Sequence, residues 1–236
     1  MRNTFTQFLA ATILLFGTSC AGSYTAVRPS TITNYTAVTS PNSPVEFGYS
    51  YGALSVHGRN KKYLKKERKR GYQTVAVRVK NNTATELNFS RDLELYFGDR
   101  PVMPISGLQA ANDMKQGVWI YLLYAPLAAT VGGTYDPQTG VTTGGTIIPW
   151  GLGVSAGNIL GSSSANTNMR NEFAANDLTN KVIRPGETVT GILCLRETNV
   201  APLHLVLRNV AIQTRPSTPT PSQIPSPAQA LPAGGQ

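Results

Sequence analysis

The sequence has few of the residues that build metal centres, disulfides and catalytic triads. Its 236 residues include two cysteines and two histidines, and charged residues make up only 14% of the chain. An average soluble protein has about 25% charged residues. Neither His57 nor His204 has a cysteine, a second histidine or a carboxylate at the spacing of a zinc ligand set. We therefore expect no metal ion and no cofactor.

Two common enzyme motifs are absent or lie in the wrong context. No Gly-x-Ser-x-Gly nucleophile motif occurs in the chain. The segment Gly151–Ala156 matches a dinucleotide fingerprint, but Pro149 interrupts the strand that should precede it, and no βαβ pattern follows. The sequence therefore favours a non-enzymatic role over a nucleotide-dependent reaction.

Long apolar runs are scarce as well, and the first one lies at the N-terminus. Arg2 precedes an apolar core at residues 8–16, and small residues follow it, which is the order of a secretory signal peptide at residues 1–19. The core is too short to span a bilayer comfortably. Cys20, which follows Gly-Thr-Ser, resembles the lipobox cysteine of bacterial lipoproteins. The resemblance implies that Cys20 is acylated and becomes the mature N-terminus; ordinary cleavage after Ala21 is the alternative.

Both ends of the mature chain have the composition of unfolded segments. Residues 21–44 are rich in Ser, Thr, Pro and Asn, so we expect residues 20–44 to form a lipidated cysteine and a flexible tether. Residues 213–236 are rich in proline and are expected to be disordered. If Cys20 is acylated, Cys194 is the only remaining thiol, and its apolar neighbours predict a buried, unpaired cysteine.

Residues 45–212 show the alternating pattern of β-strands. Val75, Val77 and Val79 share one face of the clearest strand. The predicted strands are Val45–Tyr51, Tyr72–Val79, Leu93–Phe97, Thr188–Leu195 and Leu203–Ile212. Short strands separated by turn signals predict a mainly β fold, an immunoglobulin-like antiparallel sandwich.

A loose family resemblance supports the same fold class. The runs Val75–Asn82 and Ile183–Gly191 are similar to exported bacterial immunoglobulin-like domains: a valine strand and an Asn-Asn-Thr turn are followed later by a Pro-Gly-Glu turn into a strand. The resemblance implies an accessory or binding role. It supplies no catalytic residues that could be assigned to this chain.

The positive charge of the chain is concentrated in one segment. Residues 59–70 contain eight basic residues and one acid, a net charge of +7 out of +9 for the whole chain. In a helix, one broad face would carry Lys61, Lys62, Lys65, Lys66 and Lys69. Such a face suits anionic lipid head groups or an acidic glycan. A solvated loop is the alternative, and an exported protein is not expected to bind nucleic acid.

The centre of the chain is nearly free of charge. Between Gln116 and Met169 only Asp136 is charged, and two apolar runs, Val118–Val131 and Thr146–Leu160, flank a polar turn region. This pattern predicts an apolar helical pair inserted at about residues 116–178. One face of the second helix would carry Gly153, Gly157 and Gly161, a spacing that allows close helix packing.

Three interpretations of this insertion remain open: packing on the sheet, insertion into a membrane, and self-association. Pro149 favours a helix that starts there, because a proline in the first helical turn sacrifices no hydrogen bond. Met169 and Phe173, on one side of Asn168–Leu178, are typical of the end of an amphipathic helix.

Taken together, these features predict a non-enzymatic cell-envelope lipoprotein, an accessory or structural component anchored through Cys20 in a membrane, expected to be the outer membrane, and exposed to the periplasm or the surface. Its expected partners are the membrane, an anionic lipid or glycan, and an envelope protein or a second copy. The alternative from another class is an envelope hydrolase or transferase that acts on glycan with dispersed carboxylates such as Asp92 and Glu94.

Overall fold

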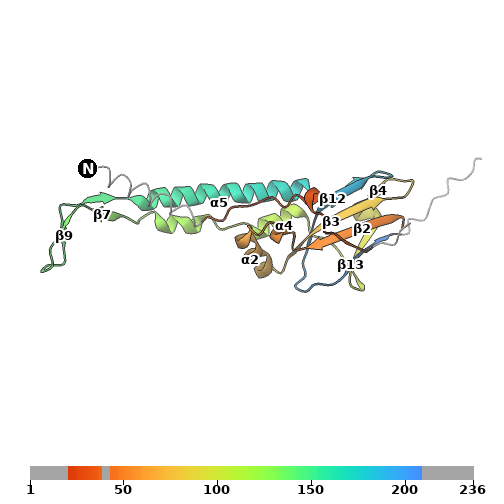
Figure 1. The fold of residues 1–236 in the computed structure, drawn as a ribbon, viewed down its shortest axis with the longest axis horizontal. Coiled ribbons are helices and arrows are strands. Elements are labelled where there is room, and N and C mark those ends of the chain that lie inside the picture. Colours follow the sequence, from red (N-terminus) through yellow and green to blue (C-terminus); the bar gives the residue numbers. More distant parts are fainter. Residues whose placement is uncertain (1–20, 39–42, 209–236) are drawn as a thin grey trace, which may run out of the picture.

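The computed structural model describes residues 21–38 and 43–208. The predicted signal peptide, the acylation site Cys20 and the tail from residue 213 lie outside the described residues. Figure 1 shows a body of sheets and short helices from which one long helix and a β-ribbon project to one side.

The body is organised around a four-stranded antiparallel sheet in the order β1-β2-β3-β12. Its strands are β1 (Thr36–Ala37), β2 (Val45–Tyr51), β3 (Gln73–Asn81) and β12 (Thr188–Leu195). β3 lies between β2 and β12, with Val77 opposite Tyr49 on one side and Gly191 on the other. Residues 75–77 of β3 are all fully buried, so both faces of this strand are covered.

A second antiparallel sheet covers one face of the first. It has the order β13-β5-β6 and consists of β5 (Leu93–Phe97), β6 (Arg100–Val102) and β13 (Leu203–Leu207). The short pair β4 (Leu87–Asn88) and β11 (Val182–Ile183) lies beside it, and α3 (Phe89–Asp92) leads into β5. One apolar core joins the two sheets and includes Val75, Val77, Val79, Leu93, Leu95, Leu193 and Leu203.

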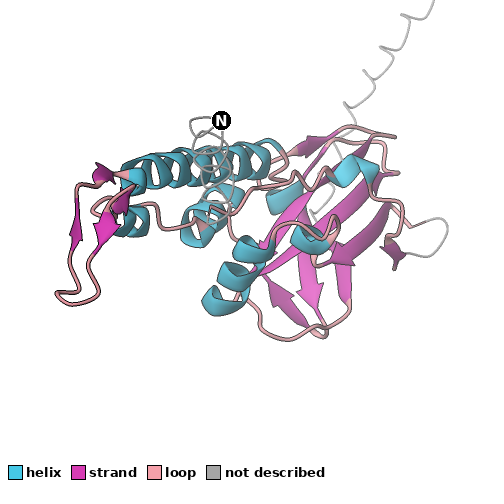
Figure 2. Ribbon diagram, turned by 60° about the vertical axis from the view of Figure 1, so that its left-hand side comes forward, coloured by secondary structure: helices cyan, strands magenta, loops and turns pink. Residues whose placement is uncertain are grey.

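Helices cover the opposite face of the first sheet (Figure 2). They are η3 (Ala53–Ser55), α2 (Lys61–Arg70), α4 (Gly107–Met114) and the C-terminal half of α5 (Trp150–Ala175). The second core contains Tyr63, Met114, Met169 and Phe173 from the helices and Ala76, Ile192 and Cys194 from the sheet. The small side chains of Ala76 and Cys194 leave room for helices at this face. Cys194 is buried and its thiol is free, as predicted.

The prediction of antiparallel β structure is confirmed, and β2, β5 and β12 have the predicted bounds. The fold is mixed rather than mainly β, because 33% of the described residues are helical and 30% are in strands. The additional helical residues lie in segments for which the sequence predicted loops or the inserted helical pair.

The segment between α4 and α5 differs from the predicted helical pair. Trp119–Tyr124 forms a 3-10 helix, η4, and the chain then forms an antiparallel ribbon of β7 (Ala129–Val131), β8 (Thr134–Tyr135), β9 (Thr142–Thr143) and β10 (Thr146–Ile148). Pro126 stops the helical turn because it has no N–H to donate. The first predicted helix is therefore wrong, whereas α5 begins directly after Pro149 as predicted.

We call residues 119–161 the arm: η4, the ribbon and the N-terminal half of α5. The buried side of α5 is the row Gly151, Ser155, Asn158, Ser162, Ala165, Met169 and Phe173, so Met169 and Phe173 lie in the core as predicted. Gly153 and Gly157 are exposed. Among the described residues, no atom would lie within 4 Å of a β-carbon added at either position.

The predicted packing face of Gly153, Gly157 and Gly161 is therefore wrong within the described residues. A β-carbon at Gly161 would meet only the Ala21 methyl group, at 3.3 Å. The close contact lies at Gly151, where a β-carbon would collide with the carbonyl oxygens of Tyr124 and Leu127. The glycine row failed as a signal because the buried row starts at Gly151 and advances by three and four residues around another side of the helix.

The two kinds of glycine should respond oppositely to alanine. Gly151→Ala should lower the free energy of unfolding by about 1–3 kcal/mol, because backbone atoms block the new methyl group. Gly157→Ala, the matched control, should raise it by up to ~1 kcal/mol through helix propensity alone. Denaturant unfolding measures both. Destabilisation by Gly157→Ala, or stability of Gly151→Ala equal to the parent protein, would contradict this packing.

Candidate functional site

The segment that directly follows Cys20 is bound to the folded body. The Gly22 N–H donates to Gln116 Oε1 at 3.1 Å, and Gln116 Nε2 donates to the Gly22 carbonyl oxygen at 2.7 Å. Thr25 and Asn60 form a second reciprocal pair, with bonds of 2.8 Å and 2.9 Å. Both partners are buried side chains from distant parts of the sequence. The first residues after the predicted acylation site are therefore held in place.

One carboxylate on α5 accepts three hydrogen bonds from this segment. Glu172 accepts hydrogen bonds from the backbone N–H groups of Val27 at 2.9 Å and Arg28 at 2.7 Å, and also from the Tyr24 hydroxyl. Burial, and then the Glu172 carboxylate, raise the pKa of Tyr24 far above its usual value. The Val27 side chain is fully buried in the helical core.

The prediction of a flexible tether at residues 20–44 is thus wrong for residues 21–38. The serine- and threonine-rich composition resembles a linker, but side chains far away in the sequence satisfy the backbone of this segment. β1 adds a further attachment, since Thr36 and Ala37 pair with β2.

A polar junction joins this segment to two helices, α2 and α5. Asn166 of α5 exchanges hydrogen bonds with the backbone of Gln116, at 2.8 Å and 3.0 Å, and accepts one from the Tyr63 hydroxyl of α2 at 3.1 Å. Burial raises the pKa of Tyr63 to about 12. Gln116 in turn holds Gly22, so α2, α5 and the N-terminal segment meet at one point.

The basic segment forms helix α2 rather than a loop. Tyr63 and Glu67, one turn apart, are buried, while the predicted residues Lys61, Lys62, Lys65 and Lys69 are exposed and Lys66 is half-buried. Gly71, with a φ of 66°, ends the helix in the left-handed conformation that glycine adopts freely. The basic last turn, residues 68–70, also stabilises the helix C-terminus.

Lys62 connects the basic helix to the arm. Its Nζ donates to the Tyr121 hydroxyl at 3.0 Å and lies 5.6 Å from the centroid of that ring. Beside the start of α2, a cavity of about 560 Å³ is lined by Thr25, Ala26, Arg28, Thr31, His57 and Arg59. The sequence did not single out Arg28, His57 or Arg59 as a group, because the fold of residues 21–38 is what brings Arg28 to the other two.

The arm carries most of the exposed large apolar side chains among the described residues. They include Trp119, Ile120, Leu122, Leu123, Val141, Ile147, Leu152 and Leu160. Trp119 is 80% exposed, and Leu123 and Leu160 are each 70% exposed. Among residues 21–38 and 43–208, no helix combines the length and apolar character needed to cross a bilayer.

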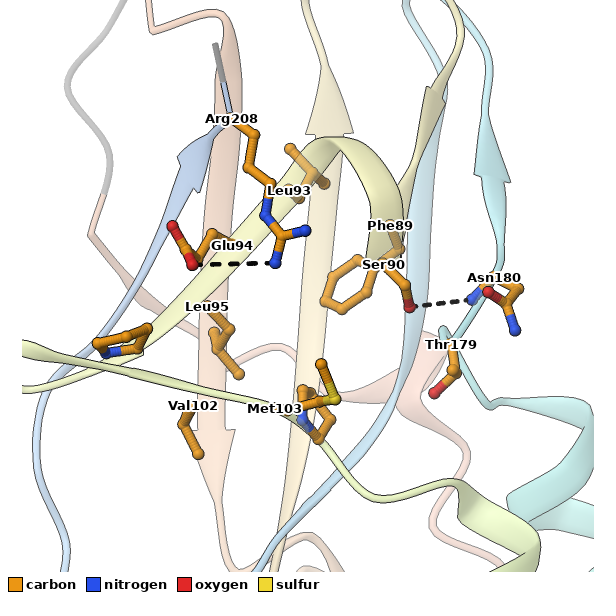
Figure 3. A pocket seen from close by; sticks show the side chains of 12 residues that line it. Phe89, Ser90, Leu93, Glu94, Leu95, Val102, Met103, Thr179, Asn180 and Arg208 are labelled. Atoms are coloured by element: carbon orange, nitrogen blue, oxygen red, sulfur yellow. Dashed lines mark hydrogen bonds and ion pairs between the residues drawn. The ribbon is translucent and has the colours of Figure 1, made fainter. Parts of the chain in front are cut away.

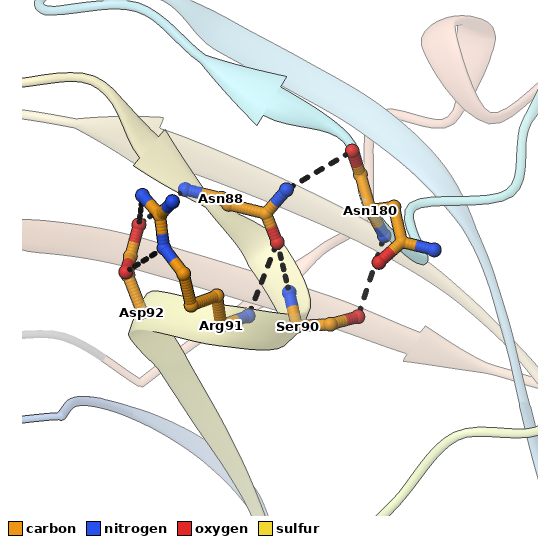
Figure 4. Close-up of polar contacts among 5 residues, drawn as sticks. All are labelled: Asn88, Ser90, Arg91, Asp92 and Asn180. Carbon is orange, nitrogen blue, oxygen red and sulfur yellow. Dashed lines mark hydrogen bonds and ion pairs between the residues drawn. The ribbon is translucent and has the colours of Figure 1, made fainter.

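The two carboxylates of the hydrolase alternative do not share a cavity. Glu94 lines a cavity of about 360 Å³, where its Oε1 lies 3.8 Å from the Arg208 guanidinium (Figure 3). Asp92 does not line that cavity. It accepts from the Asn88 N–H at 2.7 Å and from Arg91, and Arg91 lowers the pKa of Asp92 (Figure 4). Asp92 therefore stabilises the turn into β5.

Comparisons with protein-family models, curated proteins and solved structures returned no match. The candidate functional surface is therefore defined by the geometry of this structure alone. It consists of the N-terminal segment, the basic helix α2 and the apolar arm, which are joined through Gln116, Lys62 and Asn166.

Glu172 should control the attachment of the N-terminal segment. Glutamine has one acceptor oxygen for three donors, so Glu172→Gln should lower the free energy of unfolding by about 1–3 kcal/mol. It should also speed protease cleavage within residues 21–38. Asn171→Ala, at an exposed position of the same helix, is the control. Equal cleavage rates in Glu172→Gln and the control would contradict this attachment.

Glu67 should make stability depend on pH. Burial raises its pKa above the usual value of 4.5, although bonds from the Thr74 N–H and hydroxyl oppose the shift. The favourable contribution of the protonated form is complete below the unfolded-state pKa and is lost as pH rises through the folded-state pKa. Glu67→Gln should therefore gain stability relative to the parent protein between pH 4 and pH 7, as measured by urea unfolding. A difference that does not change with pH would contradict this.

Proposed function

We propose that this protein is a non-enzymatic lipoprotein of the cell envelope, an accessory or binding component held at the membrane surface through acylated Cys20. The observation that carries the proposal is the attachment of residues 22–28 to the body through Gln116, Asn60 and Glu172. If Cys20 is acylated, no long flexible segment would separate the membrane anchor from the body.

The length of the connection supports this geometry. Ala21 lies against α5 at Gly161. The predicted acylation site is the residue before Ala21 in the chain, and successive Cα atoms are about 3.8 Å apart. A flexible tether of twenty residues would have allowed the body to move by several times that distance. The anchor therefore brings both α2 and the arm close to the lipid head groups.

The charge of α2 supports an anionic partner. Each basic residue near an anionic membrane surface contributes about 1 kcal/mol of attraction. Part of the positive charge of α2 is explained by the stability of its last turn. The exposed Lys61 and Lys65 lie outside that last turn. They and Lys69, which is also exposed, are the residues that we assign to the head groups.

We also propose that the two sheets form a loosely immunoglobulin-like module without catalytic function. A shared apolar core between two antiparallel sheets supports it. The glycan hydrolase alternative is not favoured, because Asp92 is engaged by Arg91 and Asn88 and lies outside the cavity that Glu94 lines.

Cys20→Ser should release the protein from the membrane fraction, since it removes the acylation site. Intact-mass analysis of the parent protein should show the added mass of acyl chains on a polypeptide that starts at Cys20. A parent protein that starts at Gly22 without added mass would contradict the anchor.

The triple substitution Lys61→Gln, Lys65→Gln and Lys69→Gln should abolish the salt-sensitive part of binding to anionic vesicles. Lys62 is left intact because it contacts Tyr121. The matched control instead removes three exposed charges away from α2 and the arm: Arg78 on β3, and Lys181 and Arg184 on either side of β11. Flotation at low and high salt measures the effect, since the attraction is screened within about 8–10 Å. Equal binding of both triple variants would contradict the assignment.

A further inference from the structure

The exposed apolar arm is the largest feature that the anchor and the basic helix leave unexplained. We propose that the arm, residues 119–161, lies in the interfacial layer of the leaflet that holds the Cys20 acyl group, with its apolar side chains between anionic lipid head groups. The inference rests on the proposed function and specifies what the anchored protein contacts.

The exposed apolar area extends over every part of the arm. Trp119 and Leu123 lie on η4, Ile147 on the ribbon and Leu160 on α5, and all four are at least 69% exposed. Water-exposed apolar patches on this scale mark an interaction site. The arm contains no basic residue and one acidic residue, Asp136, so that single carboxylate is the only charged side chain of the arm that opposes transfer to an apolar environment.

The ribbon shows what kind of partner fits. Neighbouring residues of a strand point to opposite faces, and both Ile147 and Ile148 of β10 are exposed, at 69% and 42%. β10 pairs only with β7 in this two-stranded sheet. Apolar side chains on both faces suit surroundings that enclose the ribbon, such as lipid, better than a flat protein surface that covers one face.

The position of the arm selects the same partner. Ala21, the residue after Cys20, contacts α5 at Gly161, the end of the arm nearest the body. Lys62 of the basic helix contacts Tyr121 on η4. The residue that follows the proposed acyl anchor, the positive charge and the apolar side chains therefore lie along one stretch of the molecule, an arrangement that complements an anionic membrane surface.

The composition of the arm indicates how deeply it would enter the lipid layer. A two-stranded ribbon leaves backbone groups unpaired along its edges, and these cannot enter the hydrocarbon without a large penalty. Both tryptophans of the chain, Trp119 and Trp150, lie in the arm, and tryptophan prefers the head-group level. The Asp136 carboxylate binds Gln138 and Thr139 at the polar turn of the ribbon, which suits the aqueous side of this layer.

The two tryptophans make intrinsic fluorescence a reporter of the arm alone. The acylated protein, purified in detergent, is reconstituted into phosphatidylcholine–phosphatidylglycerol vesicles whose acyl chains carry bromine near the head groups. Emission should shift to shorter wavelength and be strongly quenched. Leu123→Asp should lose most of the quenching, whereas Val200→Asp, at a position that is 71% exposed outside the arm, should retain it.

The outcomes separate the two proposals. Protein that floats with the vesicles but shows no quenching would overturn the position of the arm and leave the anchor intact. Protein that does not float would overturn the anchor itself. A concentration-dependent blue shift without vesicles, together with a native oligomer, would show that a second copy covers the arm and would also overturn the inference.

Discussion

The three hydrogen bonds that Glu172 accepts from the N-terminal segment are the constraint on which the rest of this account depends. They fix Val27 in the helical core and direct the chain back toward Gly22, where Gln116 holds it. The Gly22–Gln116 and Thr25–Asn60 pairs complete the attachment. Without all of these contacts a free chain would join an acyl anchor to the body, and neither α2 nor the arm would have a defined position relative to it. One carboxylate thereby links the fold to its proposed location.

The second determinant of this architecture is the burial of β3 and β12 on both faces. Valines at positions 75, 77 and 79 pack on the second sheet, while Ala76 and Cys194 face the helices. The helical layer needs only the C-terminal half of α5 to cover this face, through Met169 and Phe173. The N-terminal half therefore projects beyond the sheet, and together with η4 and the ribbon it forms the arm.

Local sequence patterns predicted the elements that a regular alternation or a single proline defines. The alternation of Val75, Val77 and Val79 indicates β3, and Pro149 indicates the start of α5. Three expectations failed for physical reasons. Residues 21–38 look like a linker because their partners, such as Glu172, are distant in sequence. Pro126 ends the first apolar run as a helix. Gly153 and Gly157 lie on a side of α5 that no other described segment covers, and Gly161 meets only Ala21. No local pattern reveals which side of a helix will meet a distant segment.

Amide hydrogen exchange of the acylated protein in vesicles tests the central claim most directly, because it reports whether the chain after Cys20 is held or free. The account predicts that the Val27 and Arg28 amides are protected to about the same degree as those of β2. Complete exchange of these two amides within seconds, while β2 stays protected, would contradict it, because residues 21–38 would then be the flexible tether that their composition resembles.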